Sequence, residues 1–340
     1  MHVPVLHPAR FWEPSEGSSV RCRLCPHQCL VPDGGAGTCG ARANRGGSLW
    51  TRVYGNIVAL HVDPVEKKPL YHFLPDTAIL SAGTTGCNLA CRFCQNWSLS
   101  RADPGAPPEV HAVPPKRLVE AAAASGCPSI AFTYNEPTIQ AEYVMDAAAE
   151  AHAAGLKTAM VTNGYIAKAA IPEVYRDIDA ANVDLKAFDD DFYRTVCGGS
   201  LAPVLATLEA LKARGTWVEI TTLVIPGLND LPERMRTEAA WIRDHLGPDV
   251  PLHLTAFHPD YRMQDRPPTP PEALRACRLA ALDEGLRYVY EGNLETDARD
   301  TRCPTCGTVV IRRAWTGVQE MALREGRCTS CHAAIAGVWS

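Results

Sequence analysis

The sequence contains no run of eighteen consecutive apolar residues, and its first ten residues lack the continuous apolar core of a signal peptide. A helix needs about 20 mostly apolar residues to cross a bilayer, so we expect neither a membrane span nor a secretory leader. We therefore predict a cytoplasmic protein with no membrane partner. In that reducing compartment, cysteines are better explained by metal binding than by disulfides.

A large excess of charge of one sign is also missing. The chain has 33 Lys and Arg against 38 Asp and Glu, which gives a formal net charge of −5. Proteins that bind nucleic acid need clustered basic side chains, and the sequence has no long basic stripe, so we expect no nucleic-acid partner. An apolar content of 46% is typical of a folded globular protein and argues against wholesale disorder.

Cysteine, in contrast, is abundant. Most of the fourteen cysteines lie in three groups: Cys22 to Cys39, Cys87 to Cys94, and Cys303 to Cys331. The remaining three stand alone in the sequence: Cys127, Cys197 and Cys277. Isolated thiols usually behave as small buried apolar side chains. The grouped cysteines are the candidates for metal ligands.

The central group has the spacing C-x3-C-x2-C over Cys87, Cys91 and Cys94, directly after the apolar run 78–83. An iron–sulfur cube is normally held by four thiolates, so a loop that offers three leaves one iron open to a non-protein ligand. The alternatives are a zinc knuckle that borrows a fourth ligand and a chance run in a cysteine-rich chain.

The two flanking groups each offer four thiols. The amino-terminal group has the spacing C-x2-C-x3-C-x9-C and consists of Cys22, Cys25, Cys29 and Cys39. Four thiols suit structural zinc or a second iron–sulfur cluster, and the count does not separate the two. The carboxyl-terminal group is a pair of C-x2-C knuckles, Cys303 with Cys306 and Cys328 with Cys331. This pattern is typical of a zinc ribbon or rubredoxin-like fold, whose zinc would be structural and which we expect to dock on the main domain or on a protein partner.

Between the cysteine groups, helical stretches end at a glycine and β-branched runs follow within a few residues. The expected helices cover residues 121–125, 138–154, 203–214 and 232–246. The expected strands cover residues 78–82, 129–134, 157–162, 181–185, 217–225 and 251–257, with a possible seventh at 287–290. Such alternation predicts an α/β fold with parallel strands and right-handed crossovers, either an open doubly wound sheet or a barrel. In a parallel barrel, active groups gather at the carboxyl ends of the strands, and polar residues follow every expected strand.

Taken in order along the chain, several segments resemble motifs of the radical SAM superfamily, and more narrowly its activating-enzyme branch, the relatives of pyruvate formate-lyase activating enzyme. The narrowest resemblance is to the radical SAM member of the AmmeMemoRadiSam system. The segments are residues 22–29, 63–73, 87–97, 134–137, 161–164, 183–188 and 257–261. The resemblance implies a partial (βα)6 barrel, open on one side, at residues 76–295. A small Cys-rich domain would precede it at 1–75, and a zinc-ribbon-like segment would follow at 296–340.

The resemblance also implies a reaction. Cys87, Cys91 and Cys94 would hold a [4Fe–4S] cluster whose open iron is chelated by S-adenosylmethionine. Reductive cleavage would give methionine and a 5′-deoxyadenosyl radical that abstracts hydrogen from an unknown substrate, as in the enzymes that activate glycyl-radical proteins. A flavodoxin or ferredoxin would be the electron donor, and Memo-like and AMMECR-like proteins would be further partners.

Residues that contact S-adenosylmethionine are implied in the same way. Asn135 and Glu136 would bind the methionyl ammonium, Thr162 and Asn163 would lie near its carboxylate, Lys186 would neutralise that carboxylate, and His258 would contact the ribose. The activating enzymes commonly have Asp before Thr-Asn-Gly, where this chain has Val161. A monovalent-cation site seen in that branch therefore lacks one carboxylate here, and Asp184 is either part of the cofactor site or the partner of a neighbouring side chain.

Other functions remain open from the sequence. The radical could modify a small molecule or a peptide instead of a partner protein. A non-enzymatic iron–sulfur electron carrier is disfavoured, because carriers usually saturate their clusters with thiolates. A zinc-ribbon binding module would leave the βα region without a role. The charged segment 63–69 is either a solvated linker or a functional part of the motif that contains it.

Overall fold

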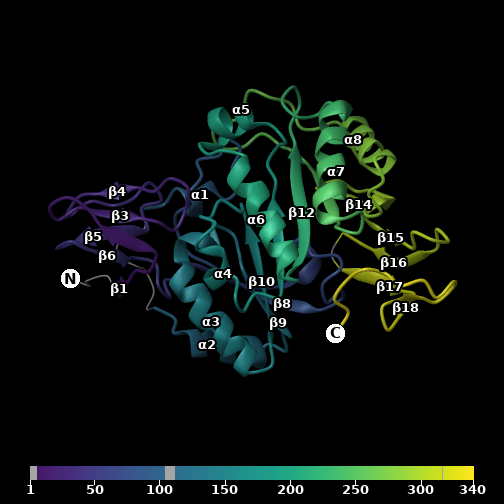
Figure 1. Cartoon of the computed structure of the whole chain (residues 1–340). Coiled ribbons are helices and arrows are strands. Elements are labelled where there is room, and N and C mark those ends of the chain that lie inside the picture. The colour runs from purple at the N-terminus through teal and green to yellow at the C-terminus, as the bar shows by residue number, and fades with distance from the viewer. Residues whose placement is uncertain (1–5, 104–111, 316) are drawn as a thin grey trace.

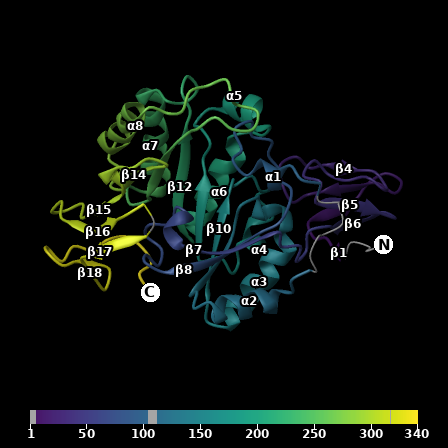
Figure 2. The same cartoon turned by 180° about the vertical axis from the view of Figure 1, so that it is seen from behind.

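The structure, a computed structural model, describes residues 6–103, 112–315 and 317–340. The first five residues, which belong to the stretch considered for a leader, lie outside this range. Three parts follow one another across the molecule (Figure 1). The amino-terminal sheets and the carboxyl-terminal strands lie on opposite sides of a central α/β domain, and the reverse view shows the same arrangement (Figure 2).

The central domain is built on one eight-stranded sheet with the order β14-β13-β12-β11-β10-β9-β8-β7. Its strands are β7 (Ala59–Pro64), β8 (Ala78–Gly83), β9 (Ser129–Phe132), β10 (Lys157–Thr162), β11 (Ala180–Asp184), β12 (Trp217–Val224), β13 (Leu252–Ala256) and β14 (Val289–Gly292). Strands β8 to β14 pair in parallel and in sequence order, whereas β7 pairs with β8 antiparallel. Because the order never reverses, the sheet is not doubly wound. Within the described residues β7 and β14 do not pair, so the barrel is open on one side.

Helices connect the successive parallel strands and make six βα units before the seventh strand. They are α2 (Pro115–Ala124), α3 (Ala141–Ala153), α4 (Ile171–Val174), α6 (Ala202–Ala213), α7 (Pro232–Leu246) and α8 (Pro271–Asp283). Helices α2, α7 and α8 begin with a proline, whose fixed φ suits the first helical position. The partial (βα)6 barrel is thus confirmed, including the possible seventh strand.

Shorter helical turns lie in the loops around the barrel. They are η1 (Val65–Lys67), α1 (Trp97–Ser100), η2 (Pro137–Gln140), α5 (Asp190–Phe192), η3 (Tyr193–Cys197) and η4 (Asp297–Arg299). Among these, η3 is a π-helical turn, a rare conformation that is frequent near functional sites.

The amino-terminal part consists of two small antiparallel sheets. One has the order β1-β6-β5 and the other β2-β3-β4. The strands are β1 (His7–Pro8), β2 (Trp12–Pro14), β3 (Val20–Cys22), β4 (Leu30–Val31), β5 (Arg42–Arg45) and β6 (Ser48–Thr51). A buried ion pair ties this part to the barrel, because the Arg42 guanidinium lies 2.6 Å from the carboxylate of Glu142 on α3. Removing one partner of such a pair leaves an uncompensated buried charge and costs about 3–5 kcal/mol.

The segment after β7 fills the barrel near the amino ends of its strands. Its apolar side chains form one buried cluster with residues of four strands: Val65, Leu70, Phe73, Leu74, Ile79, Ala131, Ala159 and Ala180. Asp63 and Lys68 are both buried and pair at 2.8 Å. A solvated linker is therefore the wrong description of residues 63–69. We call residues 65–74 the plug.

The carboxyl-terminal part docks on the plug side of the barrel. Its strands are β15 (Thr301–Arg302), β16 (Val309–Arg313), β17 (Val318–Met321), β18 (Leu323–Arg324) and β19 (Arg327–Cys328). They share a buried cluster with Tyr71 of the plug and with Tyr288 and Tyr290 of the barrel. Phe73 also forms a β-bridge with Val338. The carboxyl-terminal part therefore docks on the main domain, which was one of the two expectations for it. The boundaries at residues 75 and 296 stay predictions, although β7 precedes the first of them and belongs to the central sheet.

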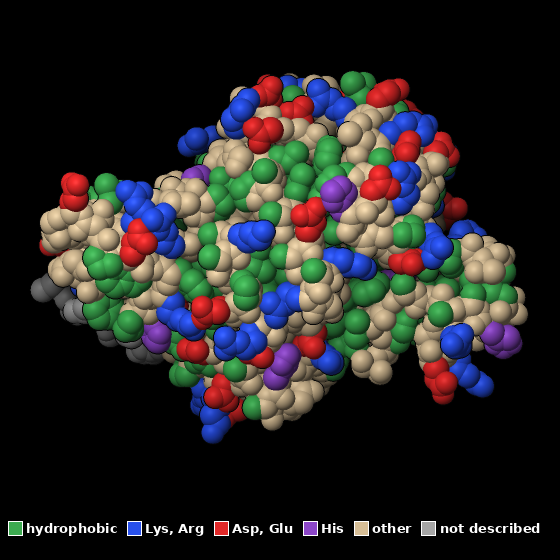
Figure 3. Space-filling view, in the orientation of Figure 1, with side chains coloured by type: hydrophobic (Ala, Val, Ile, Leu, Met, Phe, Trp, Pro, Cys, Tyr) green, Lys and Arg blue, Asp and Glu red, His purple; other side chains and the backbone are tan. Residues whose placement is uncertain are grey.

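No single helix in the described part of the chain is long and apolar enough to span a membrane. One pair of helical segments, Asp190–Cys197 with Ala202–Ala213, reaches the length and apolar composition of a span only when both are counted together, and the two are bent by 110° relative to each other. On the face shown in Figure 3, basic and acidic side chains are interspersed over the barrel.

Candidate active site and metal centres

The three central cysteines lie in the loop that follows β8, at the carboxyl end of the first parallel strand. Polar groups of the protein contact two of the three sulfurs. The N–H of Leu89 donates to Cys87 Sγ at 3.4 Å, the amide of Asn163 donates to the same sulfur at 3.7 Å, and Ser100 Oγ lies 3.2 Å from Cys94 Sγ. Burial raises the pKa of the Cys87 and Cys94 thiols. Donors aimed at sulfur suit thiolates that bind a metal, because ligation holds the sulfur deprotonated.

A fourth thiol lies beside this loop. Cys197, at the end of η3, is fully buried, and its thiol is the largest cause of the raised pKa of Cys91, ahead of burial. The same turn fixes the loop backbone, since the N–H groups of Ala90 and Arg92 donate to the carbonyls of Cys197 and Val196 at 2.7 and 3.0 Å. This contact could not be predicted from the sequence, because Cys197 lies more than one hundred residues beyond the loop and belongs to no cysteine motif.

Glu136 lies after β9 and joins two strand ends. Its Oε1 accepts from the N–H of Thr138 at 2.8 Å and from the hydroxyl of Thr162 at 2.7 Å, and its Oε2 accepts from the N–H of Asn163 at 2.7 Å. Burial raises the pKa of this carboxyl. A carboxylate has about four acceptor positions, so these three bonds leave one for a ligand.

Asn135 holds the cysteine loop from the adjacent position. Its side-chain oxygen accepts from the N–H of Thr84 at 3.0 Å, and its amide donates to the Thr84 hydroxyl and to the carbonyl of Gly86, both at 3.0 Å. Asn135 thus fixes the residues just before Cys87. Thr162 and Asn163 are also buried at the end of β10, where Asn163 contacts Cys87.

Asp184 and Lys186 form a close pair after β11. The Lys186 ammonium lies 2.7 Å from Asp184 Oδ2. Burial lowers the Lys186 pKa, but Asp184 and then Cys91 raise it by more, so this lysine stays charged beside the cysteine loop. Asp184 therefore pairs with a neighbour, the second of the two expectations for it. His258, two residues beyond β13, is exposed, unlike the buried Glu136, Thr162 and Asn163.

A polar cluster inside the barrel escaped the sequence analysis. The hydroxyl of Tyr134 donates to Asp63 Oδ2 at 2.9 Å, and the Lys68 ammonium lies 4.6 Å from the centre of the Tyr134 ring. Burial raises the Asp63 pKa, but the hydrogen bonds from Lys68 and Tyr134 lower it by more. The pKa is therefore below its ordinary value and Asp63 is ionised. The contact links the segment after β7 to the strand end that carries Asn135 and Glu136.

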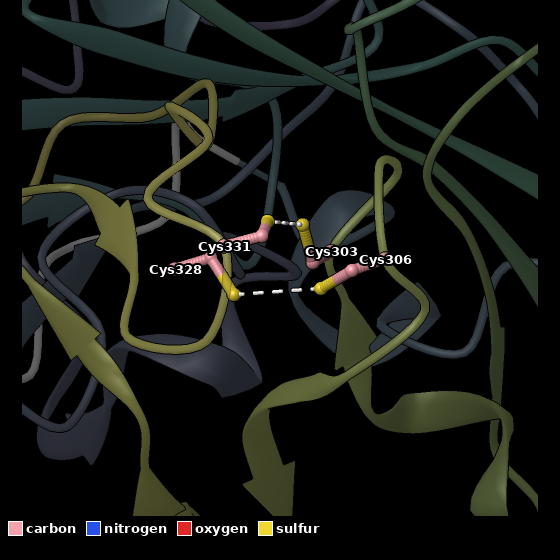
Figure 4. A group of neighbouring side chains, drawn as sticks. All are labelled: Cys303, Cys306, Cys328 and Cys331. Atoms are coloured by element: carbon pink, nitrogen blue, oxygen red, sulfur yellow. Dashed lines mark hydrogen bonds between the residues drawn. The ribbon is translucent and has the colours of Figure 1, made fainter.

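The four carboxyl-terminal cysteines converge on one point. All four sulfurs lie within 4.8 Å of one another, with Cys303 and Cys331 at 3.5 Å and Cys306 and Cys328 at 3.7 Å (Figure 4). A tetrahedral ion with Zn–S bonds of about 2.3 Å separates its sulfurs by about 3.8 Å. These four cysteines can therefore bind a metal, and zinc fits the spacing.

The four amino-terminal cysteines line a single cavity. Its walls also include Leu24, His27, Arg42 and Asn88. Asn88 directly follows Cys87, so the wall of this cavity reaches the central cysteine loop. The expected grouping of Cys22, Cys25, Cys29 and Cys39 thus corresponds to one place in the structure.

Comparison with known proteins agrees with this arrangement. The model of the radical SAM superfamily matches residues 82–239. An uncharacterised protein of Methanocaldococcus jannaschii is 41% identical over 90% of this chain and 91% of its own length. The pyruvate formate-lyase-activating enzyme of Clostridium pasteurianum is 27% identical over 61% of this chain and 89% of its own length.

Two further comparisons cover shorter regions. The benzylsuccinate synthase activating enzyme of Thauera aromatica is 31% identical over 38% of this chain and 39% of its own length. Among solved structures, Streptococcus suis SuiB bound to S-adenosylmethionine is similar with a TM-score of 0.50 and 13% identity, over 68% of this chain and 53% of that one.

The match to the superfamily begins at the end of β8 and ends in α7, so it contains the cysteine loop and the strand ends around it. Activating enzymes are among the homologues, which makes this chain an enzyme of radical chemistry. The match to the radical SAM model over residues 82–239 shows that the barrel of this chain contains a radical SAM domain, and the chain is homologous to pyruvate formate-lyase-activating enzyme.

Proposed function

We propose that Cys87, Cys91 and Cys94 hold a [4Fe–4S] cluster and that the chain binds S-adenosylmethionine at its open iron. When bound, these groups supply reductive cleavage of the sulfonium to methionine and a 5′-deoxyadenosyl radical. The observation that carries the proposal is the loop of three thiols at the carboxyl end of the first parallel strand, fixed by Asn135 and Asn163 from the next two strand ends.

In this proposal the protein's own residues position the reactants. Glu136 has one free acceptor position for the methionyl ammonium, and Lys186 offers a positive charge to the methionyl carboxylate. Thr162 and Asn163 place their polar groups beside Glu136. Asp184 holds Lys186, and His258 is the exposed residue offered to the ribose.

For the substrate, we propose the backbone of a partner protein, as for the activating enzymes to which the chain is similar. That choice is supported by the similarity to two activating enzymes. Modification of a small molecule or a peptide is the second candidate. We further propose a cytoplasmic location, a flavodoxin or ferredoxin as electron donor, and Memo-like and AMMECR-like proteins in the same system. Zinc is the metal we propose for the carboxyl-terminal cysteines.

The test is anaerobic reconstitution of the full chain with iron and sulfide, followed by reduction in the presence of S-adenosylmethionine. We expect release of 5′-deoxyadenosine, measured by mass spectrometry, and a change in the electron paramagnetic resonance of the reduced cluster when S-adenosylmethionine is added. C91A should abolish the release, because it removes a ligand of the cluster.

C127A is the matched control, since Cys127 is a buried cysteine outside the three groups. Release that persists in C91A would contradict the proposal. A cluster signal that S-adenosylmethionine leaves unchanged would favour the electron carrier instead.

A further inference from the structure

The sulfur spacing differs between the cysteine groups of this chain. The carboxyl-terminal sulfurs all lie within 4.8 Å of one another, as one tetrahedral ion requires. Among the residues that the structure describes, no three sulfurs of the amino-terminal group satisfy that spacing, and neither do the three of the central loop. In a cube each thiolate binds a different iron at a different corner, so the sulfurs stand further apart than around a single ion.

The amino-terminal sulfurs also enclose a space. Cys22, Cys25, Cys29 and Cys39 line the cavity described above, together with the apolar side chains of Leu24 and Ile139. Four sulfurs around a single zinc ion would contact it directly and leave no such cavity. Four thiols placed around a partly apolar space suit an inorganic core of several atoms.

Charge in the wall of the cavity also suits an anionic group. Arg42 is 1% exposed and lies in the wall of the cavity together with the four thiols. Arg42 is held in place by Glu142. A fixed guanidinium beside thiolates offsets part of the negative charge that four cysteines bring to a metal centre.

The cavity adjoins the central loop through a single residue. The His27 ring, between Cys25 and Cys29 in the chain, lies 2.7 Å from the carbonyl oxygen of Asn88. The amide of Asn163 donates both to Asn88 Oδ1 at 2.9 Å and to Cys87 Sγ at 3.7 Å. One hydrogen-bonded path therefore connects the amino-terminal site to a ligand of the central loop.

From the spacing, the cavity and this path, we infer that Cys22, Cys25, Cys29 and Cys39 hold a second iron–sulfur cluster that supplies electrons to the cluster in the central loop. A low-potential one-electron carrier protein reduces the amino-terminal cluster by one electron. The same electron then passes to the central cluster, which returns the amino-terminal cluster to its oxidised state. One electron enters for each S-adenosylmethionine cleaved. The second cluster goes beyond the proposed function, whereas its role as a relay rests on that function.

The composition of the second cluster is tested without any turnover. We expect about eight irons and eight sulfides per reconstituted chain, because each cube contains four of each, together with one zinc. A variant with Cys87, Cys91 and Cys94 all replaced by Ala should keep about half of that iron and show the electron paramagnetic resonance of one reduced cluster. Two zincs and about four irons in the wild-type chain, or no iron in the triple variant, would overturn the inference.

The relay is tested with C25A. We expect the ratio of 5′-deoxyadenosine release with reduced flavodoxin to release with dithionite to fall at least tenfold, because dithionite, a small reductant, reaches the central cluster directly. An unchanged ratio in C25A would overturn the relay. Should C25A fail to fold, H27A takes its place, since it breaks the contact with Asn88 and leaves all ligands intact. Loss of the proposed function would appear separately, as wild-type chain that carries two clusters and releases no 5′-deoxyadenosine.

Discussion

At the scale of single residues, Cys197 is the one that most directly bears on the chemistry. Its thiol raises the pKa of Cys91, and it lies in a turn that also holds the loop backbone. If Cys197 bound iron, the cluster would be saturated with four thiolates and could not take up a non-protein ligand. The structure instead gives it a contact with another cysteine in a fully buried position.

We therefore predict that C197A keeps the central cluster. Iron content should match that of the wild-type chain, and release of 5′-deoxyadenosine should stay within about threefold, because the substitution removes only a small buried group worth about 1 kcal/mol. The measurements are iron analysis and product quantification. Iron loss in C197A equal to that in C91A would instead identify Cys197 as a fourth ligand and remove the open iron.

At the scale of elements, a carboxyl group with a raised pKa lies in the contact between α7 and β12. Glu238 on α7 is 2% exposed, and burial raises its pKa to about 7. The hydroxyl of Thr222 lies 2.5 Å from Glu238 Oε1 and 2.9 Å from the carbonyl of Leu185. That hydroxyl has a single hydrogen, so a protonated Glu238 is the state in which both oxygens are satisfied.

This acid makes the stability of the fold depend on pH. The unfolded chain ionises Glu238 near pH 4.5, whereas the folded chain does so near 7. Stability from this group is complete below 4.5 and is lost as pH rises to about 7, by up to about 3 kcal/mol. E238Q removes this titration. Between pH 5 and pH 8 the unfolding free energy of the wild type should therefore fall, relative to that of E238Q, by most of these ~3 kcal/mol. Denaturant unfolding of both proteins at both pH values measures this difference. An equal difference in unfolding free energy at pH 5 and pH 8 would contradict the prediction.

The elements also divide into those that could be predicted from the sequence and those that could not. The parallel strands and the helices between them follow from β-branched runs and from glycines that end helices, and the expected bounds of α7 match the structure. Strand β7 was missed because it is an edge strand whose central residues are exposed and because no helix follows it to complete the βα rhythm. The plug was missed because its apolar residues follow neither the periodicity of a helix nor that of a strand.

The candidate site divides in the same way. Local spacing predicted each cysteine group, and the strand ends predicted that Glu136 and Asn163 lie near the loop. The contact of Cys197 with Cys91, and that of Tyr134 with Asp63, depend on segments brought together only by the folded barrel. The distances between the sulfurs distinguish the carboxyl-terminal group from the other two. These distances depend on the folded structure, and the number of intervening residues does not determine them.

At the scale of the whole molecule, the carboxyl-terminal part supports the barrel through the plug. Arg313 donates to the carbonyl of Tyr71 at 2.8 Å, and the His72 ring lies 2.6 Å from the carbonyl of Ala336. The buried cluster around Cys303 and Cys328 continues directly into these contacts. A metal that holds the four cysteines together therefore also holds the surface on which the plug rests.

We predict that C328A lowers the zinc content by about one per chain and exposes residues 300–340 and the plug to amide exchange, because a segment this small depends on its metal to fold. Zinc analysis and hydrogen exchange followed by mass spectrometry are the measurements. C277A is the control, since Cys277 is equally buried but lies on α8, and it should cost only about 1 kcal/mol. Unchanged exchange in the plug of zinc-free C328A would show that the two parts fold independently.

The bridge between Phe73 and Val338 has a consequence for how the chain is made. The plug, which closes the amino-end side of the barrel, lies at residues 65–74, yet the backbone that covers Phe73 is synthesised about 265 residues later. During synthesis the nascent barrel must therefore remain uncovered on that side until the segment around Val338 has been made.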